Sequence, residues 1–537
     1  MKNMKKVMIT IAALAMTFGV SAFAAAQQST QALERSQARP VEEPEFVDIQ
    51  LLREVIPAAG VALDLDFTPA PFEHTHRVSG RFKFEYPVKL LINAQASPMW
   101  PWKAQATETK QTRNIANAIV VLQDSCGHYI RRETSSSGGF SFEWTPVGCA
   151  QAEITVLALS EFNPVGVARW DKGPIASTSE LTNKNRDYRL YSFTRTFNIA
   201  DATGGLNLGT VVVPMSNDAA RGFFIMDNMQ QARAYYARLP GVTQGKLPKI
   251  NVEHTKGLKP AEIGCKDGDW GTILSFAFYL PGLDPGYIHI PWDCSDLGFD
   301  GHAHVHETSH YFQRHFLRQN PSYGRFGEGL ANVQAALIRN TSWITTTGTG
   351  LLENLDINAR MACWNGSNWA PRIDTVAQHA ECLTGGGTPG FPQAVSWDNT
   401  LANAGWFQRI IYDMTDGGNG EPEELTRFIP LGQTPATCGA TCEFGQFDKV
   451  SGGPSAPPSA LALNDVLIYY LGGSGARGTN PNYVDRGLNG LDITDVLDGF
   501  ICRGHAAPQH VSEIMSTAMG LNYDPSGAPK SCPHPED

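Results

Sequence analysis

The apolar residues of this chain change their spacing near residue 215, and the change limits the folds open to it. Between 81 and 214 they alternate with polar residues, as in Phe82, Phe84 and Tyr86, which is the period-two pattern of a half-buried strand. From Phe223 on they recur at helical spacing. We therefore expect an α+β multidomain chain, in which an N-terminal β-sandwich precedes a mixed α/β domain.

Shorter patterns indicate individual elements within these two parts. Strands are expected at Ala116–Gln123, Gly139–Trp144, Ala152–Ala158, Tyr188–Ile199, Leu208–Pro214, Lys249–Val252 and Gly286–Ile290. Helices are expected from Arg221 to about Leu239 and over Leu401–Asp416, Ile493–Cys502 and Val511–Leu521.

Residues 1–26 are typical of a secretory signal peptide. A basic start precedes an apolar run, and Ala-x-Ala at Ala22–Ala24 or Ala24–Ala26 offers a cleavage site. The alternative is an uncleaved membrane anchor, because the run is almost long enough to span a bilayer. No later segment is apolar for 18 uninterrupted residues, so we expect a secreted or periplasmic protein with no membrane span after signal removal.

The rest of the chain divides into three predicted parts. Residues 27–80 carry Pro and Glu with little periodicity, and they are either a linker or a pro-segment. Residues 81–215 make up the β-sandwich, and 216–537 make up the mixed α/β domain. Within the first, Ile115–Asp124 and Gly138–Phe142 resemble the small transthyretin-like sandwiches that are appended to exported peptidases. That resemblance implies a positioning or adhesive role without catalytic residues.

Charge and cysteine content exclude one class of partner and indicate an oxidising compartment. The formal net charge is −11 and no cluster of Lys and Arg is present, so we expect no nucleic-acid partner. Ten cysteines all follow the signal and none forms a CxxC pair, which favours disulfides over a cysteine-based zinc site. Pairing by proximity predicts Cys126–Cys149, Cys265–Cys294, Cys363–Cys382, Cys438–Cys442 and Cys502–Cys532.

The segment 300–316 carries the clearest chemistry in the sequence. His306, Glu307 and His310 form an HExxH motif in a run that has helical character. Residues four apart project from one face of a helix, so both imidazoles can reach one zinc ion at about 2.0–2.1 Å. Glu307 stands at the edge of the same site, where it can take a proton from water on the metal.

A catalytic zinc site also needs a third protein ligand and an open position. Glu328 lies in the first turn of a second predicted helix, after a loop that contains Asn320-Pro321-Ser322. Two helices joined in this way can pack antiparallel and bring Glu328 beside the histidines. We therefore expect His306, His310 and Glu328 to bind zinc, with Glu307 as the general base.

This arrangement resembles the gluzincin metallopeptidases, the group with thermolysin-like, fungalysin-like and aminopeptidase families. The matching residues after HExxH are Glu328, Gly329 and Ala331, and 17 residues separate the second histidine from the glutamate. The resemblance implies a zincin-like catalytic domain and a zinc metallopeptidase. Metzincins require Gly and His where this chain has Gln313 and Phe316, so that branch does not fit.

The resemblance implies a protein or peptide substrate, and an endopeptidase is favoured because no exopeptidase signature is present. The strand at Gly286–Ile290 could offer its edge to an extended peptide. Two alternatives remain: a non-catalytic binding or adhesion protein on a zincin scaffold, and an enzyme with a non-peptide substrate. The intact Glu307 argues against the first. The sequence does not indicate the oligomeric state.

Other polar residues have roles that the sequence leaves open. His302 shares the face of His306 and is expected to support the site or line its wall, whereas Asn332 could hydrogen-bond a ligand histidine. His304 and His315 are expected to point elsewhere. The resemblance implies a Tyr or His that stabilises the oxyanion, for which the candidates are Tyr412, His379, Tyr323 and His505.

Overall fold

A computed structural model describes residues 46–48, 75–93, 102–170, 188–238, 247–255, 272–274, 287–290, 292, 297–317, 324–339, 343–345, 352–354, 362–364, 367, 369–372, 384–386, 388–390, 404–415, 460–472, 483–487, 490–513, 515, 523–530 and 532. The helices are α4 (Ala219–Tyr236), α6 (Gly301–Phe316), α7 (Gly324–Arg339), α10 (Ala404–Thr415), α12 (Ala460–Asp465), α13 (Ile493–Cys502) and α14 (Pro508–Glu513), with the short helices η1 (Ile199–Ala202), η4 (Val466–Tyr470) and η6 (Pro525–Gly527).

The strands up to residue 213 are β1 (Phe46–Asp48), β2 (His76–Asn93), β3 (Trp102–Asn114), β4 (Ile119–Asp124), β5 (Tyr129–Glu133), β6 (Gly139–Trp144), β7 (Gln151–Leu157), β8 (Leu159–Ser160), β9 (Val165–Trp170), β10 (Tyr188–Asn198) and β11 (Leu206–Val213). Those after it are β12 (Ile250–Glu253), β13 (Thr272–Leu274), β14 (Tyr287–His289), β15 (Trp343–Thr345), β16 (Leu352–Asn354), β17 (Ala362–Trp364), β18 (Trp369–Arg372) and β19 (Thr388–Gly390).

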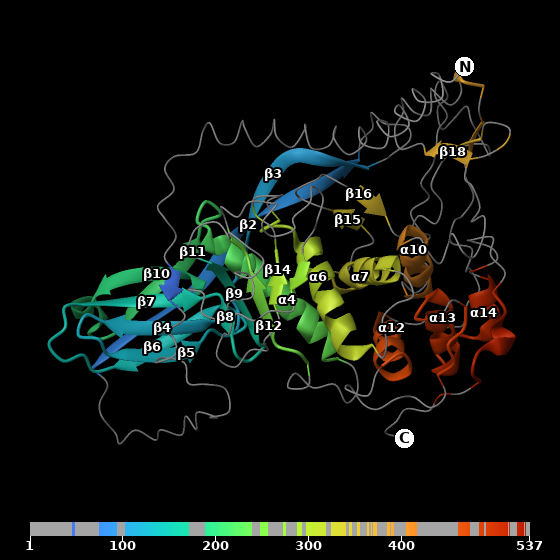
Figure 1. Ribbon diagram of the computed structural model, residues 1–537. Helices are drawn as coiled ribbons and strands as arrows, with labels where there is room; N and C mark the ends of the chain where they lie inside the picture. The colour runs from blue at the N-terminus through green and yellow to red at the C-terminus, as the bar shows by residue number, and fades with distance from the viewer. Residues whose placement is uncertain are drawn as a thin grey trace, which may run out of the picture.

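The elements follow one another across the molecule. Most of the strands up to β11 gather at one end, α4, α6 and α7 lie in the middle, and α10, α12, α13 and α14 lie at the other end (Figure 1). Helices and strands are thus both present, as the α+β prediction requires. No helix among the described residues is long and apolar enough to cross a bilayer.

The largest sheet continues across the predicted domain boundary at residue 215. Its strands follow the order β13-β14-β12-β9-β10-β7-β4-β5, with β1 added beside β10 and β8 beside β9. β9 lies before the boundary and β12 after it, and the two pair in parallel from Val165 and Ile250 onward. A second sheet, in the order β11-β2-β3 with β6 beside β2, contains β11 and β2 as parallel neighbours.

The strand expected to offer its edge to a peptide is an internal strand. β14 pairs in parallel with β12 on one side and antiparallel with β13 on the other. Both rows of its backbone groups are therefore occupied, and the interpretation of this strand as an edge was wrong. Among the described strands β13 is the outermost at this end of the sheet.

Two hydrophobic cores hold these elements together. The first contains buried residues from both sheets, from α4 and from α6, including Phe84, Phe223 and Phe312. The second lies between α7, α10, α12, η4, α13 and α14, and it includes Leu330 and Ile410. Helix α7 contributes to both, because its Ala335 packs in the first core. The region around α7 is therefore the junction between the two cores.

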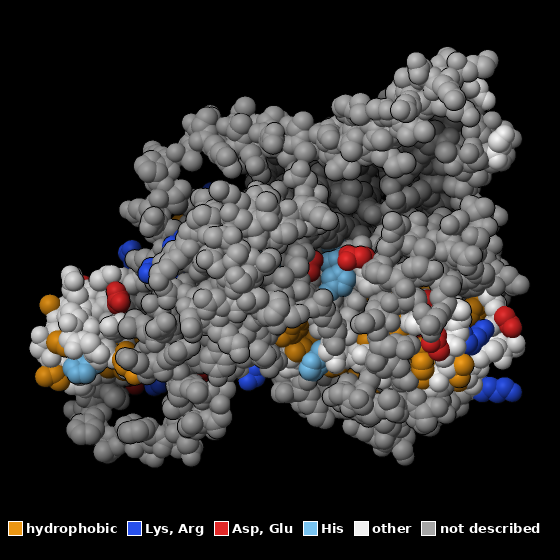
Figure 2. Space-filling view, viewed as in Figure 1, with side chains coloured by type: hydrophobic (Ala, Val, Ile, Leu, Met, Phe, Trp, Pro, Cys, Tyr) orange, Lys and Arg blue, Asp and Glu red, His pale blue; other side chains and the backbone are white. Residues whose placement is uncertain are grey.

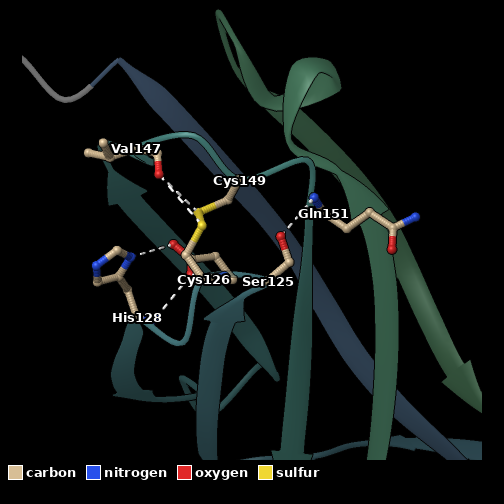
Figure 3. The surroundings of a disulfide bond; sticks show 7 residues. Ser125, Cys126, His128, Val147, Cys149 and Gln151 are labelled. Atoms are coloured by element: carbon tan, nitrogen blue, oxygen red, sulfur yellow. Dashed lines mark hydrogen bonds and ion pairs between the residues drawn. A yellow bond between two sulfur atoms is a disulfide. The ribbon is translucent and has the colours of Figure 1, made fainter.

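Two of the five predicted disulfides are formed. Cys126–Cys149 joins the turn after β4 to the segment before β7, and Cys502–Cys532 joins the end of α13 to a segment near the C-terminus. Figure 3 shows the first with Ser125 and His128 of the turn after β4 and with Val147 and Gln151 of the segment around Cys149. The other three pairs each include a cysteine outside the described residues. The predicted signal peptide and most of 27–80 also lie outside them.

Several elements differ from the sequence-based expectation. β3, β9, α12 and η4 were not expected at all, and β2 begins within the predicted linker. The last expected helix, Val511–Leu521, overlaps α14 at Pro508–Glu513, and most of its other residues lie outside the described ranges.

Gly222 allows α4 to lie directly on the large sheet. A Cβ atom added there would lie 2.5 Å from Cβ of Tyr191, which is part of β10. We predict that Gly222→Ala lowers the free energy of unfolding by about 1–2 kcal/mol, because the steric cost exceeds the gain in helix propensity. Chemical denaturation measures this value. Ala234→Gly, at an exposed position of α4, gives the propensity effect alone; a stabilised Gly222→Ala variant would contradict the close packing.

Candidate metal centre

Helix α6 forms because its start is capped and one of its faces is apolar. The Asp300 side chain accepts hydrogen bonds from the backbone N–H groups of His302 and Ala303, each at 3.0 Å, as expected of an N-cap. Val305 and Phe312 are buried in the first core. This packing fixes the rotation of the helix about its axis and therefore the direction of its histidines.

Helix α7 approaches α6 closely at the turn that carries Glu328. Gly327 lies at this contact, where an added Cβ would be 3.3 Å from Gln313 Oε1 and 3.7 Å from His310 Cε1. The side-chain amide of Gln313 donates a hydrogen bond to the carbonyl of Gly327 at 3.3 Å. A Cβ at 327 would already contact α6, so the helices are close together at the turn that carries Glu328.

The three predicted ligands converge on one point. Nε2 of His306 lies 3.1 Å from Nε2 of His310 and 3.1 Å from Oε2 of Glu328, while Nε2 of His310 lies 3.4 Å from Oε1 of Glu328. Ligand atoms about 2.0–2.1 Å from a tetrahedral ion are separated by about 3.3 Å. The spacing and the two-nitrogen, one-oxygen donor set therefore fit a metal ion of this kind, and Figure 2 shows histidine and acidic side chains meeting at the surface over α6 and α7.

The charges of the three ligands are coupled. Burial raises the pKa of Glu328, but hydrogen bonds from His306 and His310 outweigh it and lower the pKa below its ordinary value. Burial lowers the pKa of His306, but its hydrogen bond to Glu328 and the charges of Glu307 and Glu328 raise the pKa overall. The Glu328 side chain is 55% exposed, so the third ligand closes the site from the solvent side.

Asn332 fixes the orientation of the His306 ring. Nδ1 of His306 donates a hydrogen bond to Asn332 Oδ1 at 2.8 Å, which leaves Nε2 directed at the other two ligands. Nε2 of His302 donates to the same oxygen at 3.3 Å, and the Asn332 amide donates to Oε1 of Gln408 in α10 at 2.9 Å. The supporting roles expected for His302 and Asn332 thus match their contacts.

Glu307 lies next to the converging ligands with its carboxylate unused. The side chain is buried and makes no hydrogen bond among the described residues. Burial raises the pKa of Glu307, and the positive charges of His306 and His310 oppose that rise without cancelling it. An unpaired carboxylate beside two imidazoles is able to accept a proton from a water molecule that lies between the carboxylate and the imidazoles.

A second group of potential ligands is Asp124, Cys126 and Cys149. Their two sulfur atoms are joined in a disulfide, so neither is the thiolate that a metal requires. The Asp124 carboxylate accepts hydrogen bonds from the backbone N–H groups of Cys126 and His128, both at 3.0 Å, and from Nδ1 of His128. This carboxylate therefore stabilises the turn.

The four oxyanion candidates have different surroundings. Tyr412 lies one turn after Gln408 on α10 and is half-buried. Nε2 of His505 is bound to Oδ2 of Asp465 at 2.6 Å, and Tyr323 and His379 lie outside the described residues.

As expected, His304 and His315 do not join the ligands: His304 donates to the carbonyl of Leu297 at 2.8 Å, and His315 is exposed.

Two features near the site were missed by sequence reasoning. Gln408, which holds Asn332, follows α7 by almost seventy residues and no motif marks it. Glu253 and His289 form a buried pair on β12 and β14, and only their position in otherwise apolar strands could have indicated them.

Searches of protein-family models, of curated proteins and of solved structures found no match to this chain. The geometry of the site is therefore the basis for the function proposed below.

We predict that Asn332→Ala weakens zinc affinity by about 10–100-fold, because His306 loses the acceptor that orients it. Asn332→Asp retains a side-chain oxygen at the same position and is expected to keep most of the affinity. Competition with a chromophoric chelator measures both constants. Equal affinities of all three proteins would mean that the Asn332 contact does not support the ligand.

Proposed function

We propose that this protein is an exported zinc peptidase of the gluzincin type, in which His306, His310 and Glu328 hold the metal and Glu307 is the general base. The observation that carries the proposal is the convergence of three ligand atoms within 4.8 Å of one another, beside an unpaired buried carboxylate. The disulfides are compatible with an oxidising compartment outside the cytoplasm.

Each protein group then has a defined task. Zinc, when bound, supplies a Lewis acid that polarises a carbonyl oxygen and acidifies water. Glu307 accepts the proton of the attacking water and returns it to the leaving amine, so it acts first as a base and then as an acid. Asn332 keeps the His306 ring in the orientation that this site requires.

The proposed substrate is a polypeptide in extended form, cleaved within the chain. β13 is the last described strand at one end of the large sheet and lies against α6, so among the described strands its edge is placed to pair with a peptide near the site.

We predict that Glu307→Gln binds one zinc ion like the wild type and loses peptide hydrolysis by about 10²–10⁴-fold, because the amide cannot accept the proton. Elemental analysis gives the metal content, and digestion of casein and of a peptide library gives the activity. Glu143→Gln, which removes an exposed partner of Arg77 far from the motif in sequence, is the matched control and should be fully active.

The outcomes separate the candidate functions. Hydrolysis that persists in Glu307→Gln would reject this base. A wild-type protein that binds zinc and cleaves no peptide would favour the binding protein or an enzyme for another substrate, and a wild-type protein without zinc affinity would reject the metal centre itself.

A further inference from the structure

A buried pair of ionisable side chains lies on β12 and on β14, and β14 packs against α6. Glu253 and His289 are register partners in the parallel ladder of β12 and β14, so their side chains stand on the same face of the sheet. Nδ1 of His289 donates a hydrogen bond to Oε2 of Glu253, and the Thr255 hydroxyl donates to Oε1. The two residues are 4% and 2% exposed, so this contact is shielded from water.

The carboxylate of this pair remains charged. Burial raises the pKa of Glu253, but the charge and hydrogen bond of His289 and the hydrogen bond of Thr255 outweigh it and lower the pKa. With Nδ1 held by this carboxylate, the orientation of the imidazole is fixed, and so is the direction of its other nitrogen.

That other nitrogen has no partner. Nε2 of His289 is buried and makes no hydrogen bond in the described part of the chain. Leaving a buried polar atom unpaired costs about 1–3 kcal/mol, so such atoms usually bind an ordered water or serve the function of the site. The proposed reaction assigns no role to Nε2 of His289.

Glu307 is the functional group that His289 can serve. Helix α6, which carries Glu307, packs against β14, which carries His289. Both side chains are buried, and the carboxylate of Glu307 also lacks a hydrogen bond among the described residues.

We infer that His289, held by Glu253, is a positioning residue for Glu307, and that one water bridges its Nε2 to the Glu307 carboxylate. A neutral imidazole would accept a hydrogen bond from this water and a charged one would donate to it; in both cases the water donates to the carboxylate. The bridge limits the rotation of the Glu307 side chain and keeps it directed at the metal. This role rests on the proposed function, in which Glu307 is the base.

The kinetic test uses His289→Gln and Glu253→Gln in the full chain, with zinc content and stability measured beside activity. We expect one zinc ion per chain, KM within about twofold of the wild type, and kcat lower by about 10–100-fold, because a misdirected base loses much of its effect. Asp227→Asn is the control, since it breaks another ion pair between a strand and a helix, the half-buried one with Arg113. It should lower stability without changing kcat.

A second measurement does not require activity. In zinc-loaded protein labelled with ¹⁵N-histidine, the ring signals of His289 should shift when Glu307 is replaced by Gln and stay unchanged in Asp227→Asn. This test also holds if His289→Gln fails to fold, because Glu253→Gln then identifies the His289 signals.

The two measurements separate the possible failures. Unchanged ring signals in Glu307→Gln, or an unchanged kcat in stable His289→Gln and Glu253→Gln variants, would overturn the positioning role and leave a pair that only joins two strands. If the wild type cleaves no peptide but the ring signals respond to residue 307, the contact stands and the proposed function fails.

Discussion

Close contact between α6 and α7 creates the candidate metal centre. His306 and His310 are set by the helical repeat of α6, but they become a site only when Glu328 reaches them from another helix. Gly327 contributes to this approach, since a Cβ atom there would lie 3.3 Å from Gln313 Oε1 of α6. The Gln313 amide then holds the backbone of α7 at the same turn. The three groups hydrogen-bond one another at about 3 Å, and a bound metal ion would replace these contacts by metal–ligand bonds and stabilise the same packing.

The centre also joins the two hydrophobic cores. The face of α6 opposite the ligands is buried with the large sheet and α4, whereas Phe326, Leu330 and Val333 of α7 are buried in the second core with α10 and the C-terminal helices. Asn332 of α7 connects α6 and α10 by polar contacts, because it accepts a hydrogen bond from His306 and donates one to Gln408. Any displacement of α7 relative to α6 would therefore change the ligand distances and the orientation of His306 together. Metal binding and the docking of the second core are for this reason expected to support each other.

The parts of this arrangement that could be predicted from the sequence are those that local spacing determines. The helix of His306 and His310, the cap at Asp300 and the helix that carries Glu328 all follow from periodicity and turn residues within about thirty positions. β3 could not be recognised, because Trp102–Asn114 has few apolar residues to alternate. β9 was missed for the opposite reason: it is short and lies inside the sheet, where buried strands show no alternation.

Long-range pairing explains the remaining differences. The internal position of β14 is set by β12 and β13, and neither pairing leaves a mark in the sequence of β14 itself. The same holds for His289, whose only described partner lies 36 residues earlier on β12. A polar residue in an apolar strand is usually read as a surface position, yet here a parallel ladder places Glu253 beside it and removes both from water. Because burying such a pair gives little stability in itself, its place next to the helix of Glu307 is better explained by what it does for that carboxylate than by what it adds to the sheet.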